Sequence, residues 1–252
     1  MQKQEIISLL GEIEDAEFEA ELLIRQFPDE NDLRSAVKKR SEHYPLQYIL
    51  GSQPFFEDDF IVGEGVLIPR PETEFLVEIA LSKIPANREL KIIDLCAGSG
   101  CIGLTLAKKL PKSQVVLFEK SPDAIEYERR NLTLLGLKNV KIVQGDLFDG
   151  CREKYDVLIT NPPYISACEI PQLQSEVGFE PRMALDGGSD GLDFYRAIAE
   201  KWLSYLNYGG LVFAECGEEQ PRLVTELFEK YIKAYCENDQ YGVERFVIGE
   251  KL

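Results

Sequence analysis

The residues whose types and spacing best suit chemistry are Asn161, Pro162, Pro163 and Tyr164, which directly follow the apolar run 157–159. An amide or aromatic amine nitrogen is a poor nucleophile because its lone pair is delocalised, so an enzyme that alkylates it must hold its N–H hydrogens. The Asn161 side chain and the Pro162 carbonyl offer acceptors, the prolines have a fixed φ and no N–H donor, and Tyr164 offers a flat face. The pattern predicts methyl transfer to a planar nitrogen, and a proline-stiffened turn at a strand end is the structural alternative.

A glycine-rich turn lies between a predicted strand, residues 90–95, and a predicted helix, residues 102–110. Small residues in such a turn let a ligand lie against the backbone at the start of the helix. We expect a cofactor to be held there. The turn consists of Cys96, Ala97, Gly98, Ser99 and Gly100.

Acidic residues follow the next two predicted strands. Glu119 ends the strand 115–118, about 25 residues beyond Asp94, near the spacing at which an acid binds a ribose diol. Asp146 and Leu147 follow the strand 140–143, where Asp146 could bind an adenine amine or act as a loop or capping aspartate. Ligands of open α/β sheets bind at the carboxyl ends of the strands, so these acids and Asn161 are expected at one edge.

Together these residues resemble a class I S-adenosylmethionine-dependent methyltransferase of the amino-methylating type. Segments 45–51, 67–74, 180–185, 190–192 and 215–217 further resemble the protein-(glutamine-N5) methyltransferases that act on peptide chain release factors. The resemblance runs from about residue 40 to the C-terminus, and the joint occurrence of the motifs is highly specific. It implies an α/β fold with a doubly wound, mainly parallel, seven-stranded Rossmann-like sheet.

The resemblance also implies roles for the site residues. The turn 96–100 would hold the methionine end of S-adenosylmethionine, Glu119 its ribose hydroxyls, and Asp146 with Leu147 its adenine. Asn161 would also border the cofactor, and S-adenosylhomocysteine would be the product. Two positions depart from the family pattern, since Cys96 stands where many relatives have glycine and Glu119 where aspartate is frequent.

Residues 70–74 allow two interpretations. Physical chemistry alone favours Thr73 as a helix cap. The resemblance instead places the segment over the active site, with Arg70 near the substrate and Thr73 near the cofactor. His43, the only histidine, is expected to be a surface or packing residue.

The implied reaction is direct displacement, in which the substrate glutamine nitrogen attacks the activated methyl group. Asn161 and the Pro162 carbonyl would bind the amide hydrogens, while the two prolines and Tyr164 wall the planar group. No strong general base is expected. The substrate would be a class 1 release factor with its glutamine on a Gly-Gly-Gln loop. The alternatives are a ribosomal-protein glutamine methyltransferase, an N6-adenine nucleic-acid methyltransferase and an inactive cofactor-binding scaffold.

Composition narrows these alternatives. The 252 residues carry a formal net charge of −16, and their one basic cluster, residues 38–40, is short, so direct nucleic-acid binding is not expected. The spacing of the six cysteines, without a C-x-x-C pair, argues against structural zinc. We expect a cytoplasmic, monomeric protein with reduced thiols and no membrane segment. The cysteines are Cys96, Cys101, Cys151, Cys168, Cys216 and Cys236, and packing is expected to outweigh any redox role of the first two.

Apolar spacing divides the chain into three parts. Residues 1–50 predict a small helical bundle, which by resemblance helps to hold the protein substrate, and residues 51–85 a connector with a β-hairpin formed by segments 54–62 and 65–68. Residues 86–252 alternate strands and helices, as a catalytic domain of this class requires. Within it we expect a strand at 211–215, a helix at 220–234 and a closing strand at 245–248. The long irregular stretch 166–189 is expected to cover the site.

Overall fold

The computed structural model describes residues 1–11, 13–150 and 153–252, so that Cys151 lies outside the described residues. Four helices form the N-terminal bundle around their own apolar core, which includes Ile6, Leu23 and Val37. The Asp29 side chain begins the third helix by accepting from the backbone N–H of Asn31 at 2.8 Å. The helices are α1 (Lys3–Leu10), α2 (Ala16–Gln26), α3 (Glu30–Ser41) and α4 (Leu46–Leu50).

The connector contains a two-stranded hairpin, β1 (Ser52–Phe55) and β2 (Asp58–Ile61), followed by helix α5 (Pro71–Lys83). The prediction that residues 65–68 form a hairpin strand is wrong. The hairpin turns at Phe56, whose φ is 60°, and its second strand ends at Ile61. Residues 65–68 have no partner strand because the Ile68 N–H instead donates to the Glu180 side chain at 2.9 Å.

In the described part of the chain, seven strands form one sheet in the order β5-β4-β3-β6-β7-β9-β8. All pair in parallel except β9, which runs antiparallel to both of its neighbours. The strand order reverses between β3 and β6, the position where open α/β sheets bind their ligands. The strands are β3 (Lys91–Leu95), β4 (Gln114–Glu119), β5 (Val140–Gln144), β6 (Tyr155–Thr160), β7 (Leu206–Glu215), β8 (Lys233–Asn238) and β9 (Glu244–Glu250).

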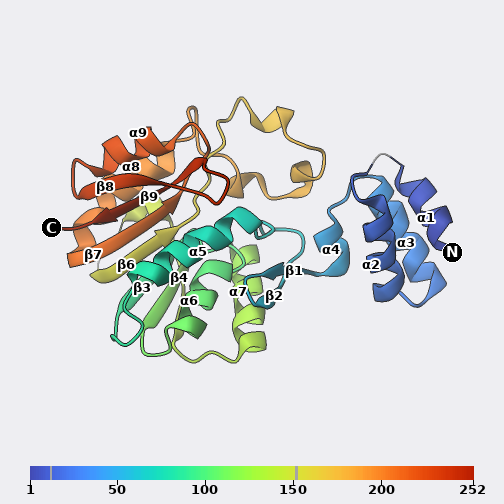
Figure 1. Cartoon of the computed structure of the whole chain (residues 1–252), viewed down its shortest axis with the longest axis horizontal. Coiled ribbons are helices and arrows are strands. Elements are labelled where there is room, and N and C mark those ends of the chain that lie inside the picture. The colour runs from blue at the N-terminus through green and yellow to red at the C-terminus, as the bar shows by residue number, and fades with distance from the viewer. Residues whose placement is uncertain (12, 151–152) are drawn as a thin grey trace.

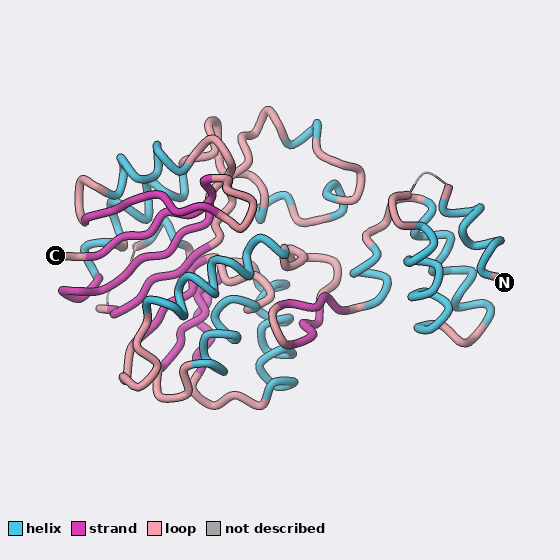
Figure 2. Tube along the Cα trace, viewed as in Figure 1, coloured by secondary structure: helices cyan, strands magenta, loops and turns pink. Residues whose placement is uncertain are grey.

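Helices cover both faces of this sheet (Figures 1 and 2). Helix α5 lies on one face with α6 (Cys101–Lys109) and α7 (Pro122–Leu135), and α8 (Asp193–Lys201) lies on the other with α9 (Pro221–Phe228). Phe55 and Phe60 of the hairpin are buried in the same apolar core as α5 and α6. The proposed border at residue 85 therefore lies within one continuous core, and the division into three parts stays a prediction.

Two elements in the C-terminal part of the chain differ from the sequence-based expectation. The helix expected at 220–234 ends at Phe228, because residues 233–238 pair with β9 as strand β8. Strand β7 begins at Leu206 rather than at residue 211 and contains Gly209 and Gly210, where its register with β6 shifts. Short 3-10 turns occur at Leu147–Asp149, Ile170–Gln172, Val177–Phe179, Arg182–Ala184 and Leu203–Tyr205.

Gly103 fixes how closely α6 packs on the sheet. A methyl group added there would overlap the buried Leu117 side chain and lie 2.9 Å from the Asp94 carboxylate. We expect Gly103→Ala to lower the free energy of unfolding by about 1–3 kcal/mol, because overpacking forces neighbours out of place. Urea denaturation of this variant and of Gly178→Ala, which has open space around the added carbon, checks this. Equal stability of the two variants would contradict it.

Candidate active site

A cavity of about 350 Å³ lies at the edge of the sheet where the strand order reverses. Its walls come from the loops after β3, β4, β5 and β6, from the connector, and from the irregular segment 166–189, which we call the cover loop. Of the predicted site residues, those that line it are Arg70, Thr73, Cys96, Ala97, Gly98, Ser99, Glu119, Asp146, Leu147, Asn161 and Pro163. Among the described residues, Gly100, Pro162 and Tyr164 do not line it.

The Glu119 carboxylate organises the turn after β3. One oxygen accepts from the Gly98 N–H at 2.9 Å, and the other accepts from the N–H groups of Lys120 and Ser121, each at 2.8 Å. A carboxylate has about four acceptor positions. One position remains on the oxygen that faces Gly98, which is enough for a ligand hydroxyl group.

The turn after β3 adopts left-handed backbone conformations. Cys96 has a φ of 57° and Gly98 a φ of 58°. The positive φ at Cys96 explains why glycine suits this position, since a side chain there is strained. Gly100, with a φ of 81°, precedes α6, and a methyl group on it would lie 3.1 Å from Leu104 and from Leu117. Gly100 therefore serves helix packing rather than the cavity.

Neither cysteine beside this turn is set up to react. Burial raises the pKa of the Cys101 thiol to about 12, and burial together with Glu119 raises the pKa of Cys96 well above its usual range. A thiol that stays protonated is a poor nucleophile.

Asp146 caps a short turn and also lines the cavity. Its side chain accepts from the Phe148 N–H at 3.0 Å, which begins the turn at 147–149, and it also lines the cavity. Lys120 lies 2.8 Å away, and this hydrogen-bonded pair holds the pKa of Asp146 below its usual range. Leu147 is buried, and its carbonyl accepts from the Trp202 indole at 2.8 Å.

The structure brings Asn161 together with Thr73. The Asn161 Nδ2 group donates to the Thr73 hydroxyl at 3.1 Å, although the two residues are 88 positions apart. No described group donates to the Asn161 side-chain oxygen, so that oxygen is available to a ligand. Thr73 does not cap α5, because Arg70 is the N-cap residue and makes no side-chain capping bond. The capping prediction for Thr73 is therefore wrong.

Pro162 and Tyr164 flank Pro163 but do not line the cavity as it does. Pro162 is buried, and Tyr164 packs against the apolar core beneath α8 and α9. The Tyr164 carbonyl accepts from the Gln220 side chain at 2.8 Å, which fixes the chain directly after the two prolines. Gly191 approaches the same carbonyl so closely that a methyl group on it would overlap the oxygen.

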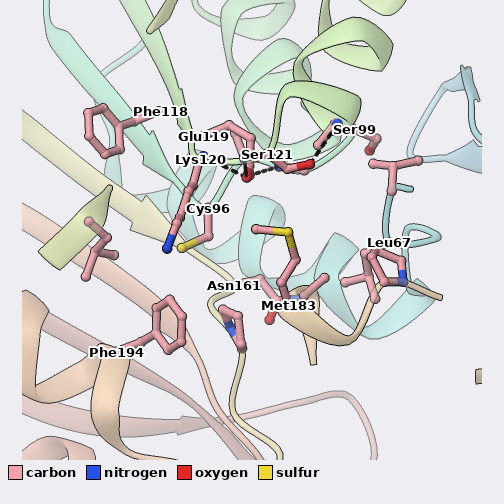
Figure 3. A pocket seen from close by; sticks show the side chains of 18 of the residues that line it. Leu67, Cys96, Ser99, Phe118, Glu119, Lys120, Ser121, Asn161, Met183 and Phe194 are labelled. Carbon is pink, nitrogen blue, oxygen red and sulfur yellow. Dashed lines mark hydrogen bonds between the residues drawn. The ribbon is translucent and has the colours of Figure 1, made fainter. Parts of the chain in front are cut away.

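Apolar side chains that the sequence did not single out complete the cavity wall. Figure 3 shows Phe118 and Phe194 on one side, Leu67 on the other, and Met183 between them above Asn161. Leu67 and Met183 lie within segments that carried the family resemblance, which was a usable signal. Phe118 and Phe194 had no such signal, because buried aromatic residues usually belong to the core.

The cover loop is attached to the N-terminal bundle and to the connector. Glu176 of this loop lies 3.0 Å from Arg40 and 3.1 Å from His43, and the Phe179 ring meets Tyr44 edge to face with 5.2 Å between centroids. Arg40 is itself held by the Glu19 carboxylate at 2.6 Å. The bundle therefore supports the segment that covers the cavity.

The connector holds the cover loop at a second point. Glu180 accepts from the Ile68 N–H and forms an ion pair with Arg70. The loop closes at its base, where the Gly187 N–H donates to the Ile165 carbonyl at 2.8 Å. Arg70 thus lines the cavity with its charge already paired by the loop.

A buried carboxyl group, Glu128 of α7, lies near the charges of Glu119 and Asp94. Its exposed fraction is 0%, and neither carboxyl oxygen has a hydrogen-bond partner among the described residues. Burial, with the charges of Glu119 and Asp94, raises its pKa from 4.5 to about 9. Burial likewise raises the pKa of Asp94 to about 8, although the Gly103 N–H donates to that carboxylate at 2.8 Å.

This shift predicts that Glu128 destabilises the fold as the pH rises. The folded chain keeps a proton on Glu128 that the unfolded chain releases above about pH 4.5. The contribution of this proton to the free energy of unfolding is therefore complete below pH 4.5 and is lost as the pH approaches 9. The slope is at most about 1.4 kcal/mol per pH unit. In urea denaturation at pH 6, 7 and 8, the free energy of unfolding of Glu128→Gln should rise with pH relative to that of the unaltered chain. The exposed control Glu126→Gln should show no such relative rise. If the free energies of unfolding of the unaltered chain and both variants change with pH in parallel, the pKa shift of Glu128 is refuted.

Neither a membrane span nor a metal centre emerges from the described residues. Their helices are too short or too polar to cross a bilayer. They contain no group of three histidine, cysteine or acidic side chains arranged to hold a metal ion.

Sequence comparisons find a family model and several relatives that match this chain. The methyltransferase small domain family model matches residues 72–176. The chain is 43% identical to the release factor glutamine methyltransferase of Geobacter sulfurreducens over 220 residues, covering 86% of this chain and 76% of that protein. It is 42% identical to the same enzyme of Thermodesulfovibrio yellowstonii (87% and 81% covered), and 34% identical to that of Buchnera aphidicola (97% and 95% covered).

Similar solved structures support the fold. A 16S rRNA N2 G1207 methyltransferase from Thermus thermophilus, solved with AdoMet and guanosine, aligns with a TM-score of 0.58 at 19% identity, covering 80% of this chain and 50% of that one. A ribosomal protein L11 methylase from Lactobacillus delbrueckii aligns with a TM-score of 0.53 at 18% identity, covering 79% and 89%. At such low identity these likenesses concern the Rossmann-like sheet alone.

Proposed function

Since this chain belongs to the release factor glutamine methyltransferase family, we propose that it methylates class 1 peptide chain release factors. The methyl group would pass from S-adenosylmethionine to the side-chain nitrogen N5 of the glutamine in the Gly-Gly-Gln motif. The observation that carries this proposal is the free acceptor oxygen of Asn161 in a cavity that also contains the turn after β3. An acceptor for N–H groups beside a cofactor turn suits methylation of a planar nitrogen.

The residues of the cavity fit S-adenosylmethionine. Ser99 has a buried hydroxyl with no hydrogen-bond partner among the described residues, and a methyl group on Gly98 would meet open space. Glu119 keeps an acceptor position for a ribose hydroxyl, and Asp146 and Leu147 would border the adenine. When bound, the cofactor supplies an electrophilic methyl group on a sulfonium.

The chain's own contribution to the reaction is alignment and exclusion of water. Asn161 Oδ1 and the Pro162 carbonyl would accept the two N–H groups of the glutamine amide and so orient its nitrogen towards the turn after β3. Holding the reacting atoms in such a near-attack geometry lowers the activation free energy by several kcal/mol. The nitrogen becomes acidic only after methylation, so its proton can leave late to water and no general base is assigned.

Pro162 and Tyr164 are proposed as contacts of the glutamine rather than of the cofactor. Neither lines the cavity, but they adjoin Asn161 and Pro163, which do, on the segment that Gln220 fixes. Arg70 is proposed to contact the substrate at the point where Glu180 attaches the cover loop. The bundle would hold the protein substrate, supported by the contacts of Arg40 with the cover loop.

Methyl transfer from radiolabelled S-adenosylmethionine tests the proposal. The purified chain would be given an unmethylated class 1 release factor, its Gln→Ala variant in the Gly-Gly-Gln loop, a ribosomal-protein mixture and duplex DNA. We expect label on the intact release factor alone. Label on DNA would favour the N6-adenine alternative, label on a ribosomal protein would favour that substrate, and cofactor binding without transfer would indicate a scaffold.

Monomeric state and cytoplasmic location stay predictions. The net charge of −16 supports the proposal that the chain does not bind nucleic acid directly, because an acidic surface is repelled by phosphates.

A further inference from the structure

The side chain of Gln220, at the start of α9, joins three separate segments of the chain. Its Nε2 group donates to the Tyr164 carbonyl at 2.8 Å and to the Gly191 carbonyl at 3.4 Å. Its Oε1 atom accepts from the Gly217 N–H at 3.0 Å. These bonds use both hydrogens of the amide. Gln220 is half-buried and does not line the cavity, so the proposed mechanism gives it no contact with cofactor or substrate.

The three partners decide which way the Gln220 amide faces. A carbonyl oxygen can only accept, so the NH2 group must point at Tyr164 and Gly191. A backbone N–H can only donate, so the amide oxygen must point at Gly217. The reverse orientation would set the amide oxygen against two carbonyl oxygens. The donors of Gln220 therefore hold the Tyr164 and Gly191 carbonyls together.

Two buried glycines let these segments approach so closely. A methyl group on Gly191 would lie 2.3 Å from the Tyr164 carbonyl oxygen and 2.4 Å from Gln220 Nε2, in the path of the hydrogen bond between them. A methyl group on Gly187 would lie 2.8 Å from both the Pro163 carbonyl oxygen and the Tyr164 Cα atom. A side chain at either position would therefore push residues 163–164 away from the end of the cover loop.

The bond to Gln220 is one of two anchors of the segment 161–164. The other anchor is strand β6, which ends at Thr160 and pairs there with β3 on one side and with β7 on the other. Between the anchors, the rings of two prolines fix φ. Few free dihedral angles remain, so a shift of the Tyr164 carbonyl would also move the Pro162 carbonyl and Asn161.

We propose that Gln220 is a positioning residue that fixes the segment 161–164 through the Tyr164 carbonyl and ties it to Gly191, where the cover loop ends. The Asn161 oxygen and the Pro162 carbonyl, which would grip the substrate amide, are thereby held in place. This assignment rests on the proposed function. Gln220 contacts no reacting atom, so it acts on the reaction only through this segment.

Two substitutions of similar length separate the donors of Gln220 from its acceptor. Gln220→Glu keeps an acceptor for the Gly217 N–H, but its carboxylate has no proton for the two carbonyls, and Gln220→Met loses all three bonds. We expect each variant to lower kcat for the release factor by about 10²-fold, as a displacement of about 1 Å at a reacting group does. Gln240→Glu makes the same change at an exposed position between β8 and β9 and should keep kcat unchanged.

The separate effects on kcat and KM distinguish positioning from a general loosening of the cover loop. kcat would be measured at saturating cofactor and expressed per cofactor site counted by calorimetric titration, so that unfolded chains do not contribute. Positioning of the reacting amide predicts a lower kcat with KM for the release factor within about three-fold, because the alignment matters in the transition state. A loosened cover loop would instead raise KM and leave kcat unchanged.

Gly191→Ala tests the same contact from its other side. The added methyl group would displace the Tyr164 carbonyl from Gln220, so kcat per cofactor site should again fall by about 10²-fold. Gly136→Ala is the matched control, because Gly136 has a similar φ, 64° against 73°, and open space around the added carbon. Its kcat per cofactor site should stay unchanged.

Different failures point to different errors. If the unaltered chain does not methylate the release factor, the proposed function falls and this assignment with it. If the unaltered chain is active and Gln220→Glu keeps its kcat, the side chain serves only as an acceptor at the start of α9, and the positioning role alone is overturned. Normal kcat in Gln220→Met or Gly191→Ala, a raised KM at unchanged kcat, or the loss of all cofactor sites in both Gln220 variants would also overturn it.

Discussion

Asn161→Ala is expected to lower kcat for the release factor by about 10²–10³-fold, the size of effect seen when an enzyme loses one preorganised hydrogen-bonding group. The substitution removes the only side-chain acceptor that the chain is proposed to offer the substrate amide. Cofactor affinity should change little, since the turn after β3 and Glu119 stay in place. Radiolabel transfer gives kcat, and calorimetry gives the Kd for S-adenosylmethionine.

Asn87→Ala is a matched control for this experiment. Asn87 is an exposed asparagine between α5 and β3, so its loss should leave both kcat and cofactor affinity unchanged. Near-normal turnover of Asn161→Ala would rule out the proposed grip on the substrate amide. A large loss of cofactor affinity would instead make Asn161 chiefly a cofactor residue.

Glu119→Ala is expected to weaken binding of S-adenosylmethionine by about 1–3 kcal/mol, or roughly 5–150-fold in Kd, the cost of leaving polar groups unpaired. The structure gives this effect two sources. The ribose would lose an acceptor, and the N–H groups of Gly98, Lys120 and Ser121 would lose the carboxylate that orders the turn. Calorimetric titration measures the affinity.

Thermal melting of the same variant distinguishes the two sources. If the turn is disordered, Glu119→Ala should also melt at a lower temperature without cofactor. Glu126→Ala, an exposed acid on α7, should match the unaltered chain in both measurements, since its ion pair with Arg129 is solvent-exposed. Unchanged affinity in Glu119→Ala would refute its role in binding the ribose.

The sequence by itself determined the fold class and the chemistry of the cavity edge. Acidic or amide residues follow successive predicted strands at 119, 146 and 161, and the parallel sheet brings them to one edge. This prediction succeeded because it depends on local patterns, namely buried strands and the turns that follow them. The spacing along the chain then fixes which residues reach the carboxyl ends of the strands.

Local patterns were insufficient where short apolar runs fit more than one structure. Residues 65–68 resemble a strand, yet their N–H at Ile68 bonds to a side chain of the cover loop. Residues 229–234 continue a helical spacing, yet pairing with β9 turns residues 233–238 into a strand. Strand and helix propensities are weak compared with the packing and hydrogen bonds that a distant partner supplies.

Only the tertiary structure decided which distant residues meet in the site. Thr73 reaches Asn161 across 88 positions, Glu180 pairs with Arg70 across 110, and Glu176 pairs with Arg40 across 136. No periodicity along the chain encodes such pairs, because they depend on how α5, the bundle and the cover loop pack around the sheet. The sequence thus determined which groups could grip an amide and a cofactor. Packing determined the partner of Asn161, because Thr73, which accepts a hydrogen bond from its side chain, comes from α5.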